Sequence, residues 1–144
     1  MIGPECFGFQ VEIRVPGSYA ARPMRPLHVL VVDDDDDIRD YLGLALRALG
    51  HTVTAAAASA QVPSGLTADV ALVDLLVLGD ATAALTLIRR LLAEGVRVVL
   101  ITGLSLDAPS VQAAIAAGAV DVLQKPFSLD AVRSAVAVPP PNPT

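Results

Sequence analysis

Leu27-His-Val-Leu-Val-Val-Asp-Asp34 is an almost continuous apolar run that ends abruptly in two aspartates. Because its residues do not alternate between apolar and polar, the run is typical of a parallel strand covered on both faces. The segment that follows, Asp35–Leu49, carries apolar residues at helical spacing and has acids at its start. Gly50 then ends the helix. A strand followed by a helix is therefore the first unit of the fold.

The same order recurs along the rest of the chain. We expect strands at Leu27–Val32, His51–Ala57, Val70–Val73, Val96–Ile101 and Ala119–Gln124, and helices at Asp35–Leu49, Ala81–Ala93, Pro109–Ala117 and Ser128–Val138. Between the second and third strands, Pro63 and Gly65 leave room for only a very short helix. Strands that alternate with helices predict an α/β fold, a doubly wound parallel sheet of five strands with helices on both faces.

This pattern covers residues 27–138, which we predict to be one domain. Residues 1–26 form an N-terminal extension punctuated by prolines and glycines, in which only Phe9–Val15 could form a short strand. Met24 could be the natural start of the chain, so it stays open whether residues 1–23 are native. The Pro-rich tail, residues 139–144, cannot continue the last helix.

Composition argues against several classes of function. The formal net charge is -5, and no cluster of Lys and Arg is interleaved with aromatics, which disfavours direct binding of nucleic acid. The longest apolar stretches are interrupted by charged residues, so we expect no membrane span. Cys6 is the only cysteine, which excludes an internal disulfide and favours a reducing, cytoplasmic location.

Polar side chains stand at the end of four of the five expected strands. Asp33 and Asp34 follow the first, Asp74 the third, Thr102 the fourth and Lys125 the fifth. In an open parallel sheet the carboxyl ends of the strands share one edge, where ligands bind. We therefore expect three carboxylates, a hydroxyl and an ammonium to meet at a single site.

The chemistry of such a site points to phosphorus. Three close carboxylates repel one another and favour a shared cation, and oxygen ligands suit Mg²⁺. A carboxylate can attack phosphorus to form an acyl phosphate, while a metal neutralises charge on the transferred group. Lys125 would add a positive charge, and Thr102 a hydrogen-bond donor. No glycine-rich turn follows the first strand, so we expect no nucleotide cofactor.

Four pieces of sequence together resemble the receiver domains of bacterial response regulators in two-component signalling. They are VLVVDD at residues 29–34, Asp74 after its apolar strand, VLITG at residues 99–103 and KPF at residues 125–127. The resemblance covers about residues 27–138. It implies the flavodoxin-like strand order 2-1-3-4-5, here with a shortened second helix.

The resemblance also implies a role for each residue of the site. Asp33, Asp34 and Asp74 would bind Mg²⁺ together with the backbone carbonyl of Leu76, Asp74 would be the phosphoacceptor, Thr102 the switch hydroxyl, and Lys125 the partner of the phosphate. The Lys125–Pro126 peptide bond is expected to be cis. The donor would be a sensor histidine kinase or phosphotransfer protein, and the phosphorylated form would bind an output partner protein. The domain would not be an enzyme beyond slow self-dephosphorylation, and it could form a homodimer.

The chain departs from the family pattern in ways that keep an alternative open. Residues 77–82 lack the usual proline after the acceptor, and Val122 stands where the family has a switch aromatic. No effector domain follows, so the chain could be a complete regulator or a fragment of one. The alternative is a protein-interaction module with a degenerate receiver fold that works without phosphorylation. A hydrolase using an aspartate nucleophile would usually have a second acid at the position of Leu76.

The two histidines stand apart from this site. His28 and His51 lie at the starts of strands, at the opposite end from the acidic residues. We expect them to be surface or capping residues.

Overall fold

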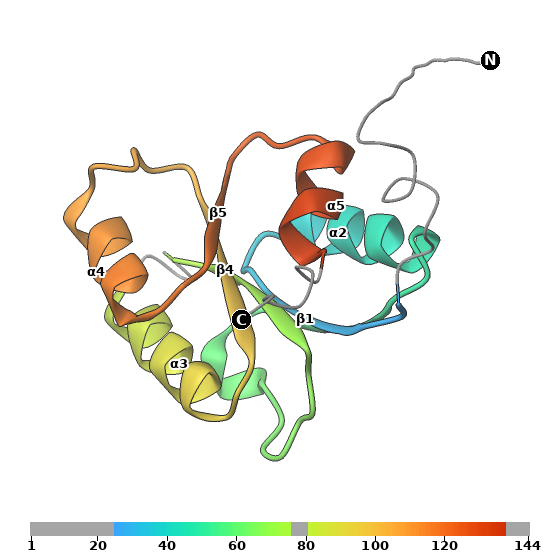
Figure 1. Cartoon of the computed structure of the whole chain (residues 1–144), viewed down its shortest axis with the longest axis horizontal. Helices are drawn as coiled ribbons and strands as arrows, with labels where there is room; N and C mark the ends of the chain where they lie inside the picture. Colours follow the sequence, from blue (N-terminus) through green and yellow to red (C-terminus); the bar gives the residue numbers. More distant parts are fainter. Residues whose placement is uncertain (1–24, 76–80, 138–144) are drawn as a thin grey trace, which may run out of the picture.

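The computed structural model describes residues 25–75 and 81–137, which form a five-stranded parallel sheet between two pairs of helices (Figure 1). In chain order the elements are β1 (His28–Val32), α2 (Asp36–Ala48), β2 (Thr52–Ala56), the 3₁₀ helix η1 (Ser59–Gln61), β3 (Val70–Asp74), α3 (Ala81–Ala93), β4 (Arg97–Thr102), α4 (Pro109–Ala117), β5 (Asp121–Gln124) and α5 (Leu129–Val136). The strand order is β2-β1-β3-β4-β5. The predicted doubly wound, flavodoxin-like fold is confirmed.

The sheet has two faces, and each covers its own core. Helices α2 and α5 lie over one face, and α3 and α4 over the other (Figure 1). Along β1, Val29 and Val31 pack toward α2 and α5, whereas Leu30 and Val32 pack toward α3 and α4. All four side chains are fully buried. Burial on both faces explains why the strand is apolar at every position rather than at every second one.

The register brings the strand ends to one edge. β1 pairs with β2 and β3, and β3 pairs with β4 so that Asp74 lies opposite Ile101. On the next pair, Thr102 lies opposite Gln124. Since all four pairings are parallel, the residues that follow β1 and β5 and those that close β3 and β4 come to the same edge.

Helix boundaries follow local side-chain chemistry. Asp35 caps α2 by accepting hydrogen bonds from the backbone N–H groups of Asp37 at 2.8 Å and Ile38 at 3.3 Å. Ser128 caps α5 through the N–H of Ala131 at 3.1 Å. Gly118 ends α4 with a positive φ of 126°, a conformation that costs other residues steric strain.

The expected very short second helix is confirmed as a single 3₁₀ turn, Ser59–Gln61. The last strand begins at Asp121 rather than at Ala119, although the N–H of Val120 already donates to Val98 O at 2.9 Å. Within the ranges 25–75 and 81–137, no helix combines the length and apolar character needed to cross a bilayer.

His51 was expected to be a surface or capping residue, and it caps the start of β1 from a buried position. Only 4% of the residue is exposed. Its Nδ1 accepts a hydrogen bond from the N–H of Leu27 at 3.0 Å, which holds the chain where it enters β1. Burial lowers the pKa of the His51 imidazole, while the nearby carboxylate of Asp69 raises it by a smaller amount.

Candidate functional site

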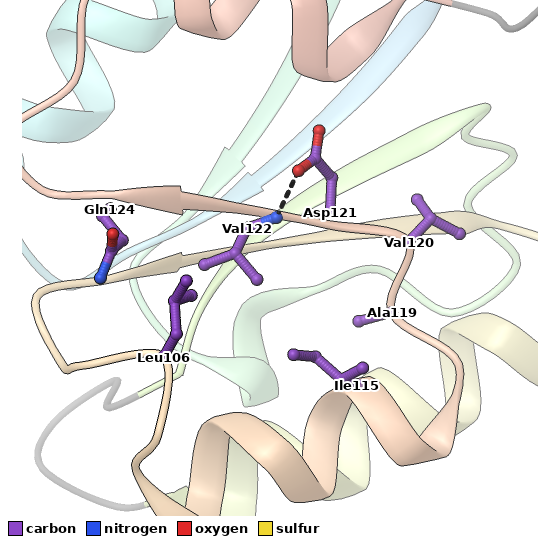
Figure 2. A pocket seen from close by; sticks show the side chains of 7 residues that line it. All are labelled: Leu106, Ile115, Ala119, Val120, Asp121, Val122 and Gln124. Carbon is purple, nitrogen blue, oxygen red and sulfur yellow. Dashed lines mark hydrogen bonds between the residues drawn. The ribbon is translucent and has the colours of Figure 1, made fainter.

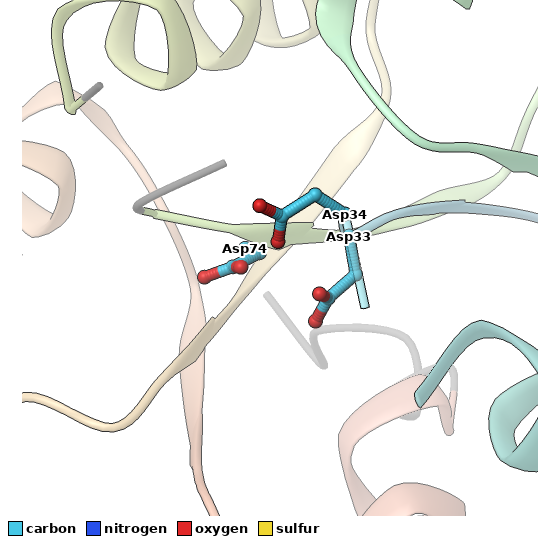
Figure 3. Close-up of side chains that lie close together, drawn as sticks. All are labelled: Asp33, Asp34 and Asp74. Atoms are coloured by element: carbon cyan, nitrogen blue, oxygen red, sulfur yellow. The ribbon is translucent and has the colours of Figure 1, made fainter. Parts of the chain in front are cut away.

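Three aspartates meet at the carboxyl edge of the sheet. Asp33 and Asp34 follow β1, and Asp74 is the last residue of β3. One carboxylate oxygen from each lies within 4.8 Å of the others, and Figure 3 shows the three side chains close together. Asp33 and Asp74 are buried, whereas Asp34 is exposed. The arrangement gives a negatively charged cluster in which Asp34 is the residue exposed to solvent.

Asp33 is held on both its backbone and its side chain. Its N–H donates to Ala56 O at 3.1 Å, which continues the pairing of β1 with β2 by one residue. Its carboxylate Oδ1 accepts from the N–H of Asp35 at 2.9 Å. The second oxygen, Oδ2, is buried and forms an ion pair with Lys125 Nζ at 3.0 Å.

Lys125 brings the positive charge of the site. Its Nζ lies 3.0 Å from Asp33 Oδ2 and 3.6 Å from Asp74 Oδ2. Burial alone would lower the pKa of the ammonium, but hydrogen bonds and charge from Asp33 and Asp74 outweigh it and raise that pKa above its ordinary value. The Lys125–Pro126 peptide bond is cis, as the resemblance implied.

Thr102 closes β4 beside Lys125 and is only 1% exposed. Its backbone oxygen accepts from the N–H of Lys125 at 2.8 Å. Its hydroxyl oxygen accepts from the N–H of Leu104 at 2.9 Å, so the hydroxyl at present organises the loop that follows β4. Strand β4 pairs with β3, which puts Thr102 at the edge where Asp74 ends its strand.

The structure brings together Asp33, Asp74 and Lys125, with Asp34 in the same cluster and Thr102 on the adjacent strand. Leu76, predicted to offer a backbone carbonyl, lies outside the described residues, as do residues 77–80 of the loop that lacks the family proline. Sequence patterns did not single out Arg39, whose guanidinium Nη1 donates to the backbone oxygen of Asp33 at 2.7 Å. The one signal was its position, a cation in the first turn of a helix.

The residues present fit a divalent cation. Three carboxylate oxygens within 4.8 Å of one another form a hard-oxygen donor set. The buried Oδ2 of Asp33 is paired with Lys125 Nζ at 3.0 Å, and a carboxylate has about four lone-pair sites, so Asp33 can accept a further interaction beside this ion pair. These features suit Mg²⁺, which takes one or a few carboxylates and keeps water or phosphate in its remaining positions.

Val122 lines a hollow in the surface beside β5 and α4, apart from the aspartate cluster. This hollow of about 360 Å³ is lined by Leu106, Ile115, Ala119, Val120, Asp121, Val122 and Gln124 (Figure 2). Leu106, Ile115 and Val120 are exposed although they are large and apolar. The side-chain amide of Gln124 donates to Leu104 O at 3.1 Å, which ties the rim of the hollow to the loop that Thr102 organises.

Comparison with known proteins agrees with this geometry. Residues 29–137 match the model of the response regulator receiver domain family. The C4-dicarboxylate transport transcriptional regulatory protein DctD of Rhizobium meliloti (strain 1021) is 35% identical over 108 residues, which are 71% of this chain and 23% of DctD. The chain therefore belongs to the response regulator receiver domain family.

Solved structures give the same family and fold. NtrX from Brucella abortus is 26% identical with a TM-score of 0.68, over 76% of this chain and 26% of NtrX. A response regulator from Thermotoga maritima is 26% identical with a TM-score of 0.64, over 78% of this chain and 95% of the other. The chain thus spans about a quarter of the length of DctD and NtrX, and nearly all of the Thermotoga protein.

Proposed function

We propose that this protein accepts a phosphoryl group on Asp74 from the phosphohistidine of a sensor histidine kinase or a phosphotransfer protein, with Mg²⁺ bound at Asp33, Asp34 and Asp74. The observation that carries the proposal is the convergence of these three carboxylates within 4.8 Å, with Lys125 Nζ 3.0 Å from Asp33 and 3.6 Å from Asp74. Membership of the receiver family supports it.

The transfer would use a carboxylate oxygen of Asp74 as the nucleophile. A new oxygen–phosphorus bond forms, the phosphorus–nitrogen bond to the donor histidine breaks, and the imidazole leaves with the electron pair of that bond. Mg²⁺, when bound, neutralises charge on the phosphoryl oxygens. Lys125 Nζ, already 3.6 Å from Asp74 Oδ2, would then hold a phosphoryl oxygen. The protein is the acceptor, and its own catalysis would be limited to slow self-dephosphorylation.

Phosphorylation would change a partner-binding face through Thr102. If the hydroxyl turned toward the phosphoryl group, it would give up the hydrogen bond from Leu104 N. Leu104 O is also the acceptor for Gln124, so movement of this loop would reach the hollow between β5 and α4. In energetic terms, phosphate would stabilise one of two arrangements that the domain already samples. An output partner would distinguish them, and DctD, described as a transcriptional regulatory protein, suggests the kind of pathway.

Acetyl phosphate provides a test that needs no kinase. Incubation with acetyl phosphate and Mg²⁺ should add the mass of one phosphoryl group to the intact protein. The gain should disappear in Asp74→Asn and on chelation of Mg²⁺ with EDTA. Persistence of the modification in Asp74→Asn would place the phosphate elsewhere, and the absence of any gain in the wild type would contradict the proposal.

A second candidate is an interaction module that binds its partner without phosphorylation, in which case the fold would be a degenerate receiver. Val122 favours it, because the residue lines the hollow at the position where the family has a switch aromatic and its side chain cannot rotate as a ring does. This function predicts equal binding of the output partner by wild type and Asp74→Ala. The cytoplasmic location expected from the sequence belongs to both candidates.

A further inference from the structure

Arg39 occupies an unusual position. It follows the five consecutive acids of residues 33–37 and lies in the first turns of α2, which begins at Asp36. The N-terminal end of a helix carries partial positive charge and disfavours a cation. Something local must compensate for a guanidinium placed there.

The compensation is visible in the contacts of Arg39. Nη1 donates to the backbone oxygen of Asp33 at 2.7 Å, and Nη2 pairs with the carboxylate of Asp36. The side chain is 20% exposed, so the contact is largely protected from water. The carbonyl that it binds belongs to the peptide joining Asp33 to Asp34, the two aspartates that leave β1 for the metal site.

We propose that Arg39 is a positioning residue for the divalent-cation site, fixing the Asp33–Asp34 peptide so that both carboxylates stay aimed at Asp74. This inference rests on the proposed function, because it assigns a support to the site through which phosphorylation would work. Arg39 would not touch the cation or the phosphoryl group. It would act through the backbone that carries two of the ligands.

The physical reason is mutual repulsion. One carboxylate oxygen from each of Asp33, Asp34 and Asp74 lies within 4.8 Å of the other two, and like charges at this separation repel. The carboxylate of Asp33 is held by the N–H of Asp35 and by Lys125, and the orientation of the peptide between Asp33 and Asp34 sets where both carboxylates point. A hydrogen bond from a charged donor to the carbonyl of that peptide opposes a change in this orientation. The site is thereby held ready before the cation arrives.

Positioning and simple electrostatics predict opposite effects, which makes the inference testable. If Arg39 acted only as a nearby positive charge, its removal would strengthen the binding of Mg²⁺. If it positions ligands, its removal weakens binding, and loss of such outer-shell support typically costs about tenfold in metal affinity. Arg39→Lys keeps the charge but loses the forked donor, so its affinity should fall between those of the wild type and Arg39→Ala.

The chain offers matched controls. On α5, Arg133 pairs with Asp130 at 3.0 Å, which repeats the i,i+3 spacing of the ion pair between Arg39 and Asp36 on another helix. Arg133→Ala therefore removes an equivalent surface pair and a positive charge without touching the Asp33 carbonyl. Asp36→Asn removes the ion pair of Arg39 and leaves the carbonyl contact in place.

The experiment is a titration of each full-length variant with MgCl₂ at constant ionic strength, followed by amide NMR spectra, which also report whether the variant is folded. We expect the dissociation constant for Mg²⁺ to rise about tenfold in Arg39→Ala, less in Arg39→Lys, and to stay within about twofold in Arg133→Ala and Asp36→Asn. Should Arg39→Ala fail to fold, Arg39→Lys decides: unchanged or tighter binding in that variant overturns the inference.

The wild-type protein separates the two proposals. If it binds Mg²⁺ and is phosphorylated on Asp74, but folded Arg39→Ala binds Mg²⁺ equally well or more tightly, only the positioning role is wrong. If the wild type binds no Mg²⁺ at all, the proposed function fails and the role of Arg39 fails with it.

Discussion

At the scale of single residues, the site depends on an imbalance of charge. Three carboxylates meet at the site, and two of them, Asp33 and Asp74, pair with the ammonium of Lys125, the only lysine in the sequence. Asp33 is completely buried, and removing the partner of a buried charge typically costs about 3–5 kcal/mol. Because the side chain of Lys125 is 28% exposed, we expect its contribution to the free energy of unfolding to be at or below the lower end of that range, about 3 kcal/mol. Lys125 thus supports the folded site as well as the proposed chemistry.

The single lysine makes its pKa measurable. After reductive methylation with ¹³C-formaldehyde, NMR should give one lysine signal, and the α-amine should titrate separately near pH 8 or below. We expect the folded-state pKa of Lys125 to lie above that of the same labelled residue in urea-unfolded protein, because Asp33 and Asp74 favour the charged form. Asp33→Asn should lower it. A folded-state pKa at or below the unfolded one would contradict the ion-pair geometry.

The sign of this shift also sets a pH dependence. A group with a raised folded pKa contributes stability that is complete below its unfolded value, about 10.4 for lysine, and is lost as pH rises through the folded value. The Lys125 contribution should therefore be unchanged across neutral pH and disappear only in strongly alkaline solution. Urea midpoints of wild type and Asp33→Asn, compared between pH 8 and pH 11, check this.

His51 predicts a change on the acid side. Burial lowers the pKa of its imidazole, so below about pH 6.5 the unfolded chain binds a proton that the folded protein resists. Stability should fall as pH decreases from about 6.5 toward the folded pKa. In His51→Asn, whose side-chain oxygen can accept the hydrogen bond from Leu27 N, the drop in urea midpoint between pH 7.5 and 5.5 should be smaller. An equal drop in both proteins would rule out His51 as its source.

At the scale of elements, the loop between β4 and α4 connects the site to the surface. Thr102 Oγ1 accepts from Leu104 N, and Leu104 O accepts from the amide of Gln124. The same loop has a second, independent tether, since the amide of Gln112 donates to Leu106 O at 2.6 Å. Only the first tether includes a residue of the proposed phosphorylation site.

Gln124→Ala should therefore separate signal transmission from phosphorylation. We expect its phosphorylation by acetyl phosphate to stay within about twofold of wild type, because the side chain is remote from the attacking oxygen in the hydrogen-bond chain. Phosphorylation should change the NMR chemical shift of the Ile115 methyl groups, and in Gln124→Ala this change should be about half of that in wild type. The loss is partial because coupling between the site and the hollow is spread over several contacts. The control Gln112→Ala should keep the wild-type response. Equal responses in all three proteins would exclude the Gln124 route.

The same elements show what sequence patterns can and cannot predict. The alternation of strands and helices, with helices on both faces of the sheet, followed from apolar runs and helical spacing, because burial on two faces leaves a strong pattern. The strand order followed only from the resemblance to receiver domains. Strand ends did not follow as closely: Asp74 and Thr102 were expected after their strands but belong to them, since pairing with the neighbouring strand continues past the last apolar residue. The first polar residue after an apolar run shows where the side chains change in character, whereas backbone hydrogen bonding to the neighbouring strand decides where the strand ends.

The candidate site was predictable where residues stand at strand ends and unpredictable where loops fold back. Parallel topology alone is enough to bring Asp33, Asp74 and Lys125 together. The contact of Arg39 with the carbonyl of Asp33 depends on the turn between β1 and α2, and the burial of His51 depends on how the chain enters β1. Neither leaves a periodic signal, so neither could be inferred from spacing.

At the scale of the whole molecule, repulsion between the carboxylates of the site lowers the stability of the entire folded domain. Its parallel strands end at one edge, where the carboxylates meet, and the two hydrophobic cores must hold the strands in place against the repulsion between these carboxylates. Unit charges about 4 Å apart in water repel by about 1 kcal/mol. In a domain of this size, such an amount corresponds to roughly 4 °C in melting temperature. Removal of one of the three negative charges should therefore produce a measurable change in the melting temperature of the protein.

Asp34→Asn tests this balance, because the residue is exposed and lies outside the two Lys125 ion pairs. Without Mg²⁺, we expect its melting temperature to rise by roughly 4 °C over wild type, since one like charge is gone. Mg²⁺ should stabilise wild type with increasing concentration, as any ligand of the folded state does, and stabilise Asp34→Asn much less. The difference in melting temperature between Asp34→Asn and wild type should therefore become smaller or change sign at saturating Mg²⁺. Calorimetry with and without MgCl₂ measures both effects, with CaCl₂ and NaCl of matched ionic strength as controls. If Asp34→Asn melts below wild type without metal, Asp34 supports the apo fold, and repulsion does not govern this edge of the sheet.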